Sequence, residues 1–465
     1  MKEQNQNPLG TEPIGRLLRK FAIPSIVSML VISLYNIVDQ FFIGRSVGPL
    51  GNAATNVAFP MTTMCIAVAL AFGIGGSSGF NLNMGRGEKR KAMYYVGNAI
   101  TMMFSLGAVV ALMAQIFMHP LLTFFGTPDE VMPYATEYVR VIACGFPFAI
   151  LGAGGAHLIR ADGSPKYSMI CNISGALINT VLDYLFVMVF GWGMFGAAFA
   201  TVIGQVATFV FAIVYFSRYK TAKIEKKHLI PNKETVTKTM HLGMAQCLNQ
   251  IAVMIIQIII NKSFKYYGAL SMYGESIPLA ATGIIMKVNQ IYFSICIGIS
   301  QGIQPIASFN RGAGKFERVK KAYRLALICA TTVSVIAFVI FQTLPLQIIS
   351  LFGEGSPEYF DFAVRFFRVF LFMTFLDGIQ PITSTFCTAI GEPNKGTFLS
   401  LTRQILFLTP LLLLMPRIFT YIKGIEYGIL GLMYTAPISD FLAAVVSIIL
   451  IRKVFKTMDR KQLSV

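Results

Sequence analysis

The chain has 465 residues, of which 55% are hydrophobic and only 13% are charged. A soluble domain carries about 25% charged residues, so this composition excludes soluble domains and predicts an integral membrane protein. The formal net charge is +18. The basic residues gather in short loops between apolar runs, which is typical of orientation in a bilayer rather than of nucleic-acid binding.

Apolar runs long enough to cross a bilayer follow one another along the whole chain. A transmembrane helix needs about 20 mostly apolar residues. A polar N-terminus precedes the first run, so no cleavable signal peptide is expected. We predict twelve spans, at 21–43, 54–80, 94–117, 134–159, 168–190, 195–217, 240–261, 279–309, 323–346, 360–388, 397–415 and 428–452.

Lys and Arg residues concentrate in alternate loops and so indicate the orientation. They are frequent in the N-terminus, at 86–91, at 218–238, at 311–324 and after the last span, and sparse in the loops between. Because cytoplasmic loops carry the excess of basic residues, both termini are predicted to lie in the cytoplasm. The alternation also favours an even number of spans.

The two halves of the chain share short motifs at a nearly constant offset. We therefore predict an N-terminal six-helix lobe at 1–217, a basic cytoplasmic linker at 218–238 and a C-terminal six-helix lobe at 239–465. Transporters built from such repeats bind their substrates between the repeats, near the midplane. The matching motifs are Gly85-Arg86-Gly87 with Gly312-Ala313-Gly314, Phe125-Gly126 with Phe352-Gly353, and Gly163-Ser164-Pro165 with Gly391-Glu392-Pro393.

Ionisable residues inside the predicted spans are candidate functional residues, because they are costly in a membrane. Asp39 in the first span and Asp183 in the fifth are predicted to lie at similar depth, in the outer half of the membrane. Asn179 precedes Asp183 by one helical turn and shares its face. Together they could bind a proton, or Na⁺ through hard oxygen ligands. The alternative is that Asp39 is solvated at the outer interface.

A second charged group is expected in the C-terminal half. Asp377 lies in the tenth span, and Lys287, with Asn289 and Gln290 beside it, lies in the eighth. They could form a charged cavity in which Asp377 and Lys287 are coupled. A structural ion pair, or a lysine that snorkels to the interface, explains them equally well.

Patterns of soluble catalysis are missing from the sequence. There is no Walker A motif, and the four histidines lack metal-ligand spacing; His157 alone deserves a test. We therefore predict no enzyme activity, no cofactor beyond a coupling ion, and no use of ATP. The seven cysteines lie in apolar stretches without a CxxC pair, as expected of packing thiols.

Together these segments resemble the multidrug and toxic compound extrusion (MATE) family, in its DinF/MepA-like branch. The resemblance covers nearly the whole chain. It rests on the first span, FAIPSIVSMLVISLYNIVDQFFIGRSVG, and on the turn NMGRGEKRKA and its counterpart NRGAGKFERVKKA. The paired loops RADGSPKY and TAIGEPNKG, the fifth-span NTVLDYLF and the sixth-span GAAFATVIGQ extend it.

The resemblance implies a V-shaped, all-helical transporter of the MATE fold in a bacterial plasma membrane. It implies alternating-access export of organic cations or amphipathic drugs in exchange for H⁺ or Na⁺. The family's N-lobe cation site, for a proton or Na⁺, would correspond to Asp39, Asn179, Asp183 and Thr201. Pro24 matches the proline at which helix one bends, and Asp377 an acidic position of the NorM-like branch. The acidic residue of that branch in helix seven is missing.

Two rival functions remain open from the sequence. One is a lipid-linked glycan flippase of the same superfamily, for which Lys287 is the one supporting feature. The other is a sensor or assembly scaffold without transport, which predicts that changes at Asp39 and Asp183 are tolerated. We expect a monomer whose partners are small organic substrates and the lipid bilayer, with no nucleic acid.

Overall fold

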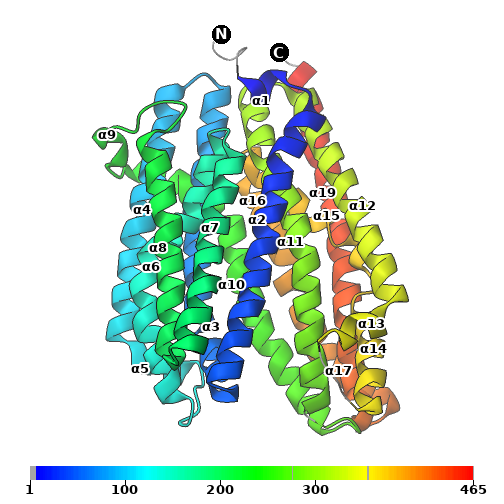
Figure 1. Ribbon diagram of the computed structural model, residues 1–465. Helices are drawn as coiled ribbons and strands as arrows, with labels where there is room; N and C mark the ends of the chain where they lie inside the picture. The colour runs from blue at the N-terminus through cyan, green and yellow to red at the C-terminus, as the bar shows by residue number, and fades with distance from the viewer. Residues whose placement is uncertain (1–6, 275, 353–355, 464–465) are drawn as a thin grey trace.

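The computed structural model describes residues 7–274, 276–352 and 356–463. In that part of the chain every regular element is a helix. Figure 1 shows the helices running side by side, with the two ends of the chain at the same end of the molecule. This arrangement agrees with the prediction of an all-helical membrane protein whose termini share one side.

The first half supplies helices that cross the molecule, with short helices between some of them. After α8 the chain passes through a linker that contains the short α9. The bounds are α1 Pro8–Thr11, α2 Ile14–Ser46, α3 Pro49–Gly85, α4 Lys89–Ile116, α5 Met118–Phe124, α6 Met132–Ala161, α7 Pro165–Asp183, the π-helical η1 Tyr184–Val189, α8 Gly193–Ser217 and α9 Lys226–Leu229.

The second half repeats this plan with more interruptions. Its bounds are α10 Lys233–Ala269, α11 Ser276–Gly312, α12 Phe316–Thr343, α13 Pro345–Ser350, α14 Pro357–Phe370, η2 Thr374–Leu376, α15 Ile379–Ala389, α16 Pro393–Leu401, η3 Thr402–Leu408, α17 Thr409–Lys423, η4 Ile425–Tyr427, α18 Gly428–Met433 and α19 Thr435–Leu463.

Ten of the helical segments in the described residues are long and apolar enough to cross a membrane. The other two predicted spans fall on interrupted segments. The span at 360–388 is divided into α14 and α15 by the 3₁₀ turn η2, and the span at 428–452 is covered by α18 and α19. In the first of these, Pro381 lies in the opening turn of α15, where a proline costs no helical hydrogen bond.

Equivalent positions of the two halves adopt the same local structure. Gly87 and Gly314 end their turns with φ of 82° and 72°, and Gly163 and Gly391 both have φ of 80°. Glycine is favoured there because a side chain is strained at positive φ. The Gln115 side chain donates to the Arg140 carbonyl at 2.7 Å, and Gln342 donates to the Arg368 carbonyl at 2.9 Å. The sequence repeat therefore corresponds to a structural repeat.

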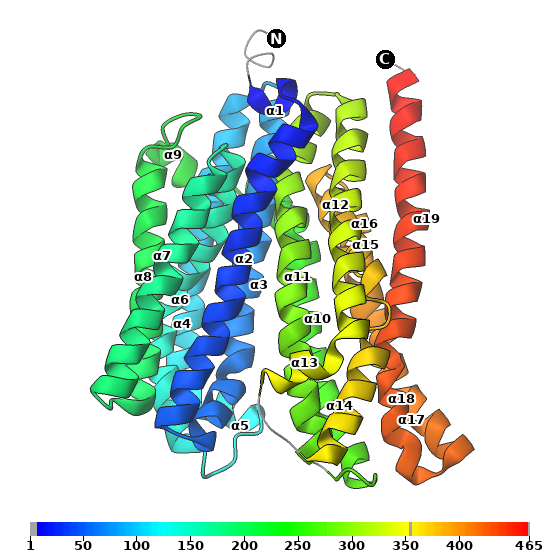
Figure 2. The same ribbon diagram turned by 45° about the vertical axis from the view of Figure 1, so that its right-hand side comes forward.

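Small residues allow the two halves to pack closely near the end that carries the termini. A Cβ added at Gly75 of α3 would lie 1.9 Å from the Thr239 carbonyl oxygen of α10, and one at Gly85 would lie 2.1 Å from the Phe309 carbonyl oxygen of α11. Figures 1 and 2 show the halves side by side at this end and farther apart at the opposite end. This is the V shape implied by the family resemblance.

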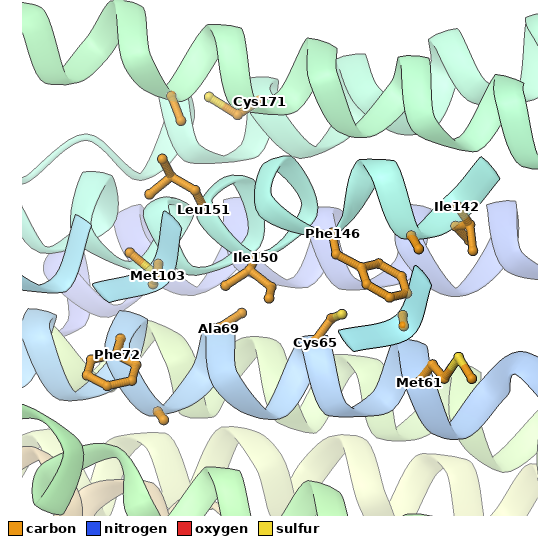
Figure 3. Packing of buried hydrophobic residues seen from close by; sticks show 14 of the residues in the cluster. Met61, Cys65, Ala69, Phe72, Met103, Ile142, Phe146, Ile150, Leu151 and Cys171 are labelled. Atoms are coloured by element: carbon orange, nitrogen blue, oxygen red, sulfur yellow. The ribbon is translucent and has the colours of Figure 1, made fainter. Parts of the chain in front are cut away.

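The N-terminal half has its own apolar core, formed by α3, α4, α6, α7 and α8. Figure 3 shows Cys65 and Ala69 of α3 facing Phe146 and Ile150 of α6, with Met61 and Phe72 farther along α3 on either side. Cys65 and Cys171 are buried there as free thiols. This core fixes the helices that carry the candidate site described next.

Candidate functional site

Two carboxylates from different helices, one buried and one half-buried, meet in the N-terminal half. Asp39 lies toward the C-terminal end of α2, and Asp183 is the last residue of α7. Their side chains lie within hydrogen-bonding reach of each other. Asp183 is only 1% exposed. Asp39 is half-buried, and its contact with Asp183 agrees with the prediction that the two residues lie at similar depth.

Three of the four carboxylate oxygens of this pair are buried without a hydrogen-bond partner. Both carboxylate oxygens of Asp183, Oδ1 of Asp39 and Oδ1 of Asn179 are buried without a hydrogen-bond partner. Two carboxylates cannot bond to each other unless one of them carries a proton, because both are acceptors when ionised. Buried acceptors without donors are costly. The geometry therefore fits a proton or a metal cation at this place.

Asn179 and Thr201 complete the group that the sequence predicted. The Asn179 amide donates to Thr201 Oγ1 at 3.3 Å, and that hydroxyl donates to the Ala197 carbonyl at 3.0 Å. Close packing of α7 on α8 makes this contact possible, since a Cβ at Gly204 would lie 2.9 Å from the Asn179 Cβ. The structure thus brings all four predicted cation-site residues to one place.

The helix that carries Asp183 changes its geometry at this point. Immediately after Asp183 the chain continues as the π-helix Tyr184–Val189. Such wide turns are rare and are frequently found at functional sites. The wide turn follows directly on the residue that meets α2.

Two tyrosines near the carboxylates were not predicted. Tyr35 of α2 and Tyr138 of α6 lie close enough to Asp39 and Asp183 to interact with both electrostatically. Tyr35 precedes Asp39 by one helical turn, so the spacing of the sequence contained a signal for it. Tyr138 comes from a separate helix, and no local pattern pointed to it.

Pro24 lies in the first half of α2, well before Asp39 in the chain. It is buried within α2, and it cannot donate to the carbonyl one turn earlier. The Ser25 hydroxyl donates to the Phe21 carbonyl at 2.8 Å, and the Ser28 hydroxyl donates to the Pro24 carbonyl at 2.9 Å. Both serines thus bond back to carbonyls of the turns around Pro24, and such bonds often bend a helix.

In the C-terminal half, Asp377 has different neighbours from those expected. Its electrostatic partners are Asp440 of α19 and Arg403 of η3. Arg403 Nε lies 2.5 Å from Asp440 Oδ1, and its guanidinium lies over the Phe293 ring at 5.3 Å. The proposed coupling of Asp377 with Lys287 is therefore wrong. The position of a residue along its own span does not show which faces of neighbouring helices meet, so the sequence did not reveal these partners.

The other predicted members of the C-terminal cavity lie apart from this cluster. Among the described residues, Lys287 forms no ion pair and is partly buried. Asn289 has a buried Oδ1 without a partner, whereas Gln290 is exposed and its carbonyl accepts from Ser294. An inventory of charges within the spans at 397–415 and 428–452 would have found Arg403 and Asp440.

The described residues hold no cluster of three or more His, Cys, Asp or Glu side chains suited to a metal ion. His157, the histidine singled out from the sequence, is buried with its Nδ1 3.3 Å from Arg160 Nη1. The oxygens around Asp39 and Asp183 are instead those of carboxylates, an amide and a hydroxyl, which are hard ligands suited to Na⁺ or a proton.

Comparison with known proteins shows similarity along nearly the whole chain. The family model described as MatE matches residues 24–185 and 245–414. The probable multidrug resistance protein YoeA of Bacillus subtilis is 26% identical over 412 residues, covering 86% of this chain and 87% of that protein. The multidrug export protein MepA of Staphylococcus aureus is 22% identical over 452 residues, covering 97% and 96%.

Solved structures share the fold. One, described as the outward-facing conformation of a multidrug resistance MATE family transporter of the MOP superfamily, superposes with a TM-score of 0.88 at 21% identity, covering 98% of this chain and 99% of that one.

Proposed function

The chain belongs to the MatE family of membrane transporters, and from that premise we propose that it is a secondary active multidrug exporter. It expels organic cations or other amphipathic compounds in exchange for H⁺ or Na⁺, by alternating access between its two halves. The names of the curated relatives YoeA and MepA, which describe multidrug resistance and multidrug export, support this proposal.

The observation that carries the proposal is the unequal charge balance of the two halves. Asp39 and Asp183 bring two carboxylates together, and their orphaned oxygens face no cationic side chain within hydrogen-bonding distance in the described residues. Burying such a pair without a counter-charge is strongly unfavourable. A cation from solution would supply the missing charge, so occupancy of this site would depend on the H⁺ or Na⁺ gradient.

The C-terminal cluster differs because it has a cation of its own. Arg403 is held 2.5 Å from Asp440 and offsets one of the two carboxylates. Its planar guanidinium also packs on Phe293. We therefore assign coupling to Asp39, Asn179, Asp183 and Thr201, with the charge of Arg403 reducing the need for an external cation near Asp377.

The distribution of basic loops supports a location and an orientation in the membrane. We propose a bacterial plasma-membrane protein with both termini cytoplasmic, because the basic loops lie at the end that carries the termini. We keep the division into lobes at 1–217 and 239–465 with a linker at 218–238, and a monomer as the transporting unit.

Efflux of ethidium or a fluoroquinolone from efflux-deficient bacteria tests this function. Asp183→Asn should reduce efflux to the level of cells without the transporter, because it removes a charge that binds the coupling cation. Collapsing the proton and sodium gradients separately identifies the ion. Asp361→Asn, at an exposed carboxylate of α14, is the matched control and should export normally.

Two results would contradict the proposed function. Wild-type efflux by Asp183→Asn at equal membrane levels would rule out coupling at this site. Efflux by the wild type that survives the loss of both gradients would rule out secondary transport.

A further inference from the structure

Helix α2 belongs to both halves of the molecule. Its first part packs in the apolar core of the C-terminal half, through Leu17, Leu18 and Phe21. Its last part packs in the core of the N-terminal half, through Ile43. Figures 1 and 2 show α2 running between the two groups of helices. A relative movement of the halves must therefore be absorbed within α2.

The contact of the first part with the C-terminal half is close. A Cβ at Gly302 of α11 would lie 2.6 Å from the Ala22 Cα, and one at Gly298 would lie 2.6 Å from the Ile26 Cα. Farther along, the hydroxyls of Ser33 and Ser294 are 2.6 Å apart. Beyond that point α2 turns to the N-terminal half, where the Ser46 hydroxyl donates to the Val187 carbonyl at 3.2 Å.

The segment before α2 is held by side chains of the C-terminal half. Arg318 of α12 donates through Nη2 to the carbonyls of Leu9 at 3.1 Å and Glu12 at 2.6 Å. Asn310 of α11 donates to the Leu9 carbonyl at 2.8 Å and accepts from Arg318 Nε at 2.9 Å. Asn310 is fully buried. These donors occupy the carbonyls that a short helix leaves free at its end.

The second half shows the reciprocal arrangement. Its first helix, α10, begins after a linker that is held by the N-terminal half. The Asn98 side chain of α4 donates to the His228 carbonyl at 2.8 Å and accepts from the Asn232 amide at 2.7 Å. Each half thus holds the starting segment of the other half's first helix.

We propose that Arg318 and Asn310 are positioning residues for transport, which fix the start of α2 to the C-terminal half. This inference rests on the proposed function. With its start fixed and Asp39 at the cation site, α2 must bend when the cation binds, and Pro24 lies between the two points. Through this bend, cation binding in the N-terminal half changes the position of the C-terminal half.

The test measures two distances in the same protein, using spin labels on cysteines introduced into a background without the native ones. Thr11 and Lys321, both exposed, report on the attachment. Leu34, which is 50% exposed, and Lys321 report on the part of α2 beyond Pro24. In the otherwise unchanged protein, acidification or added sodium should alter the second distance and leave the first unchanged.

Variants of the attachment should reverse this pattern. In Arg318→Ala the Thr11–Lys321 distance should change as well, because the segment before α2 has lost two of its hydrogen bonds to the C-terminal half. Efflux should fall about tenfold, since two charge-assisted hydrogen bonds to carbonyls are lost. Arg318→Lys should recover part of the efflux, Asn310→Ala should resemble Arg318→Ala, and Arg324→Ala, at an exposed position of α12, should behave as the wild type.

Two outcomes overturn the inference. The first is a Thr11–Lys321 distance that changes on cation addition in the protein with Arg318 intact, which can be measured even if the variants do not fold. The second is wild-type efflux by Arg318→Ala. Measured alongside, Asp183→Asn separates the two proposals: if it exports normally the proposed function fails, whereas export by Arg318→Ala alone removes only the attachment.

Discussion

Replacing Gly243 by alanine should open the contact between the two halves. Gly243 lies in α10, where a Cβ would be 1.8 Å from the Ala71 carbonyl oxygen of α3. Real Cβ atoms do not approach closer than 3.0 Å, so the helices must separate locally by about 1.2 Å, the difference between the two distances. Neither partner is a flexible side chain that could move aside, because the atom in the way belongs to the backbone of α3.

The free-energy change has two opposing contributions. Inserting a methyl group into a well-packed core costs about 1–3 kcal/mol, and the backbone contact places Gly243 in the upper part of this range. Alanine in place of glycine stabilises a helix by about 1 kcal/mol. The net effect is therefore about 1–2 kcal/mol against the packed state, which lowers its equilibrium constant by a factor of about 5–30.

The assay combines thermal unfolding in detergent with spin-label distances between the ends of α4 and α12, at Lys91 and Lys321. Gly243→Ala should lower the unfolding temperature and broaden the distance distribution toward longer values. Gly283→Ala in α11 is the control, because nothing lies within 4 Å of its added Cβ. Equal unfolding temperatures and equal distances in the two variants would refute the reasoning.

Two further predictions concern the buried ion pair and the linker. Arg403→Gln should destabilise the protein by about 3–5 kcal/mol in thermal unfolding, because Asp440 is left buried without its partner. Adding Asp440→Asn to this variant should recover part of the lost stability. An unfolding temperature of the single variant equal to that of the wild type would contradict this. Burial lowers the pKa of His228 below 6.5, and its Nδ1 accepts from the Glu225 amide at 3.1 Å. A lowered pKa means that the unfolded state binds the proton more readily, so this stabilisation is present above pH 6.5 and is lost as the pH falls below it. An NMR titration midpoint of His228 at or above 6.5 would show that burial does not control it.

The N-terminal site could be predicted from the sequence because each of its residues carries a local signal. Asp39 and Asp183 are charges in apolar runs, and Asn179 lies one turn from Asp183. The family resemblance added Thr201. The sequence predicted only that Asp39 and Asp183 lie at a similar depth in the membrane. The structure shows that their side chains come together, with Asn179 and Thr201 beside them. Whether these residues bind the coupling cation stays a prediction.

The C-terminal half was less predictable because its charges pair across interrupted helices. Arg403 lies in the π-helical η3, and Asp377 follows the 3₁₀ turn η2. Such irregular turns rotate the following side chains relative to a regular helix, so positions along a span no longer indicate which face a residue occupies. The sequence suggested that Asp377 and Lys287 could be coupled, whereas the structure pairs Arg403 with Asp440 next to Asp377.

A cation can shift a conformational equilibrium only if it binds the two states with different affinities. A site formed within one rigid half would keep its geometry when the halves move, and its affinity would not change. Asp183 is fixed in α7 of the N-terminal half, but Asp39 lies on α2, whose start is attached to the C-terminal half through Arg318 and Asn310. On the proposed attachment, movement of the halves would pull on α2 and so shift Asp39 relative to Asp183. By linkage, the same coupling lets the bound cation favour one arrangement of the halves. One carboxylate lies on the helix that both halves share, and the other lies on a helix of one half. This division would allow the cation gradient to drive export.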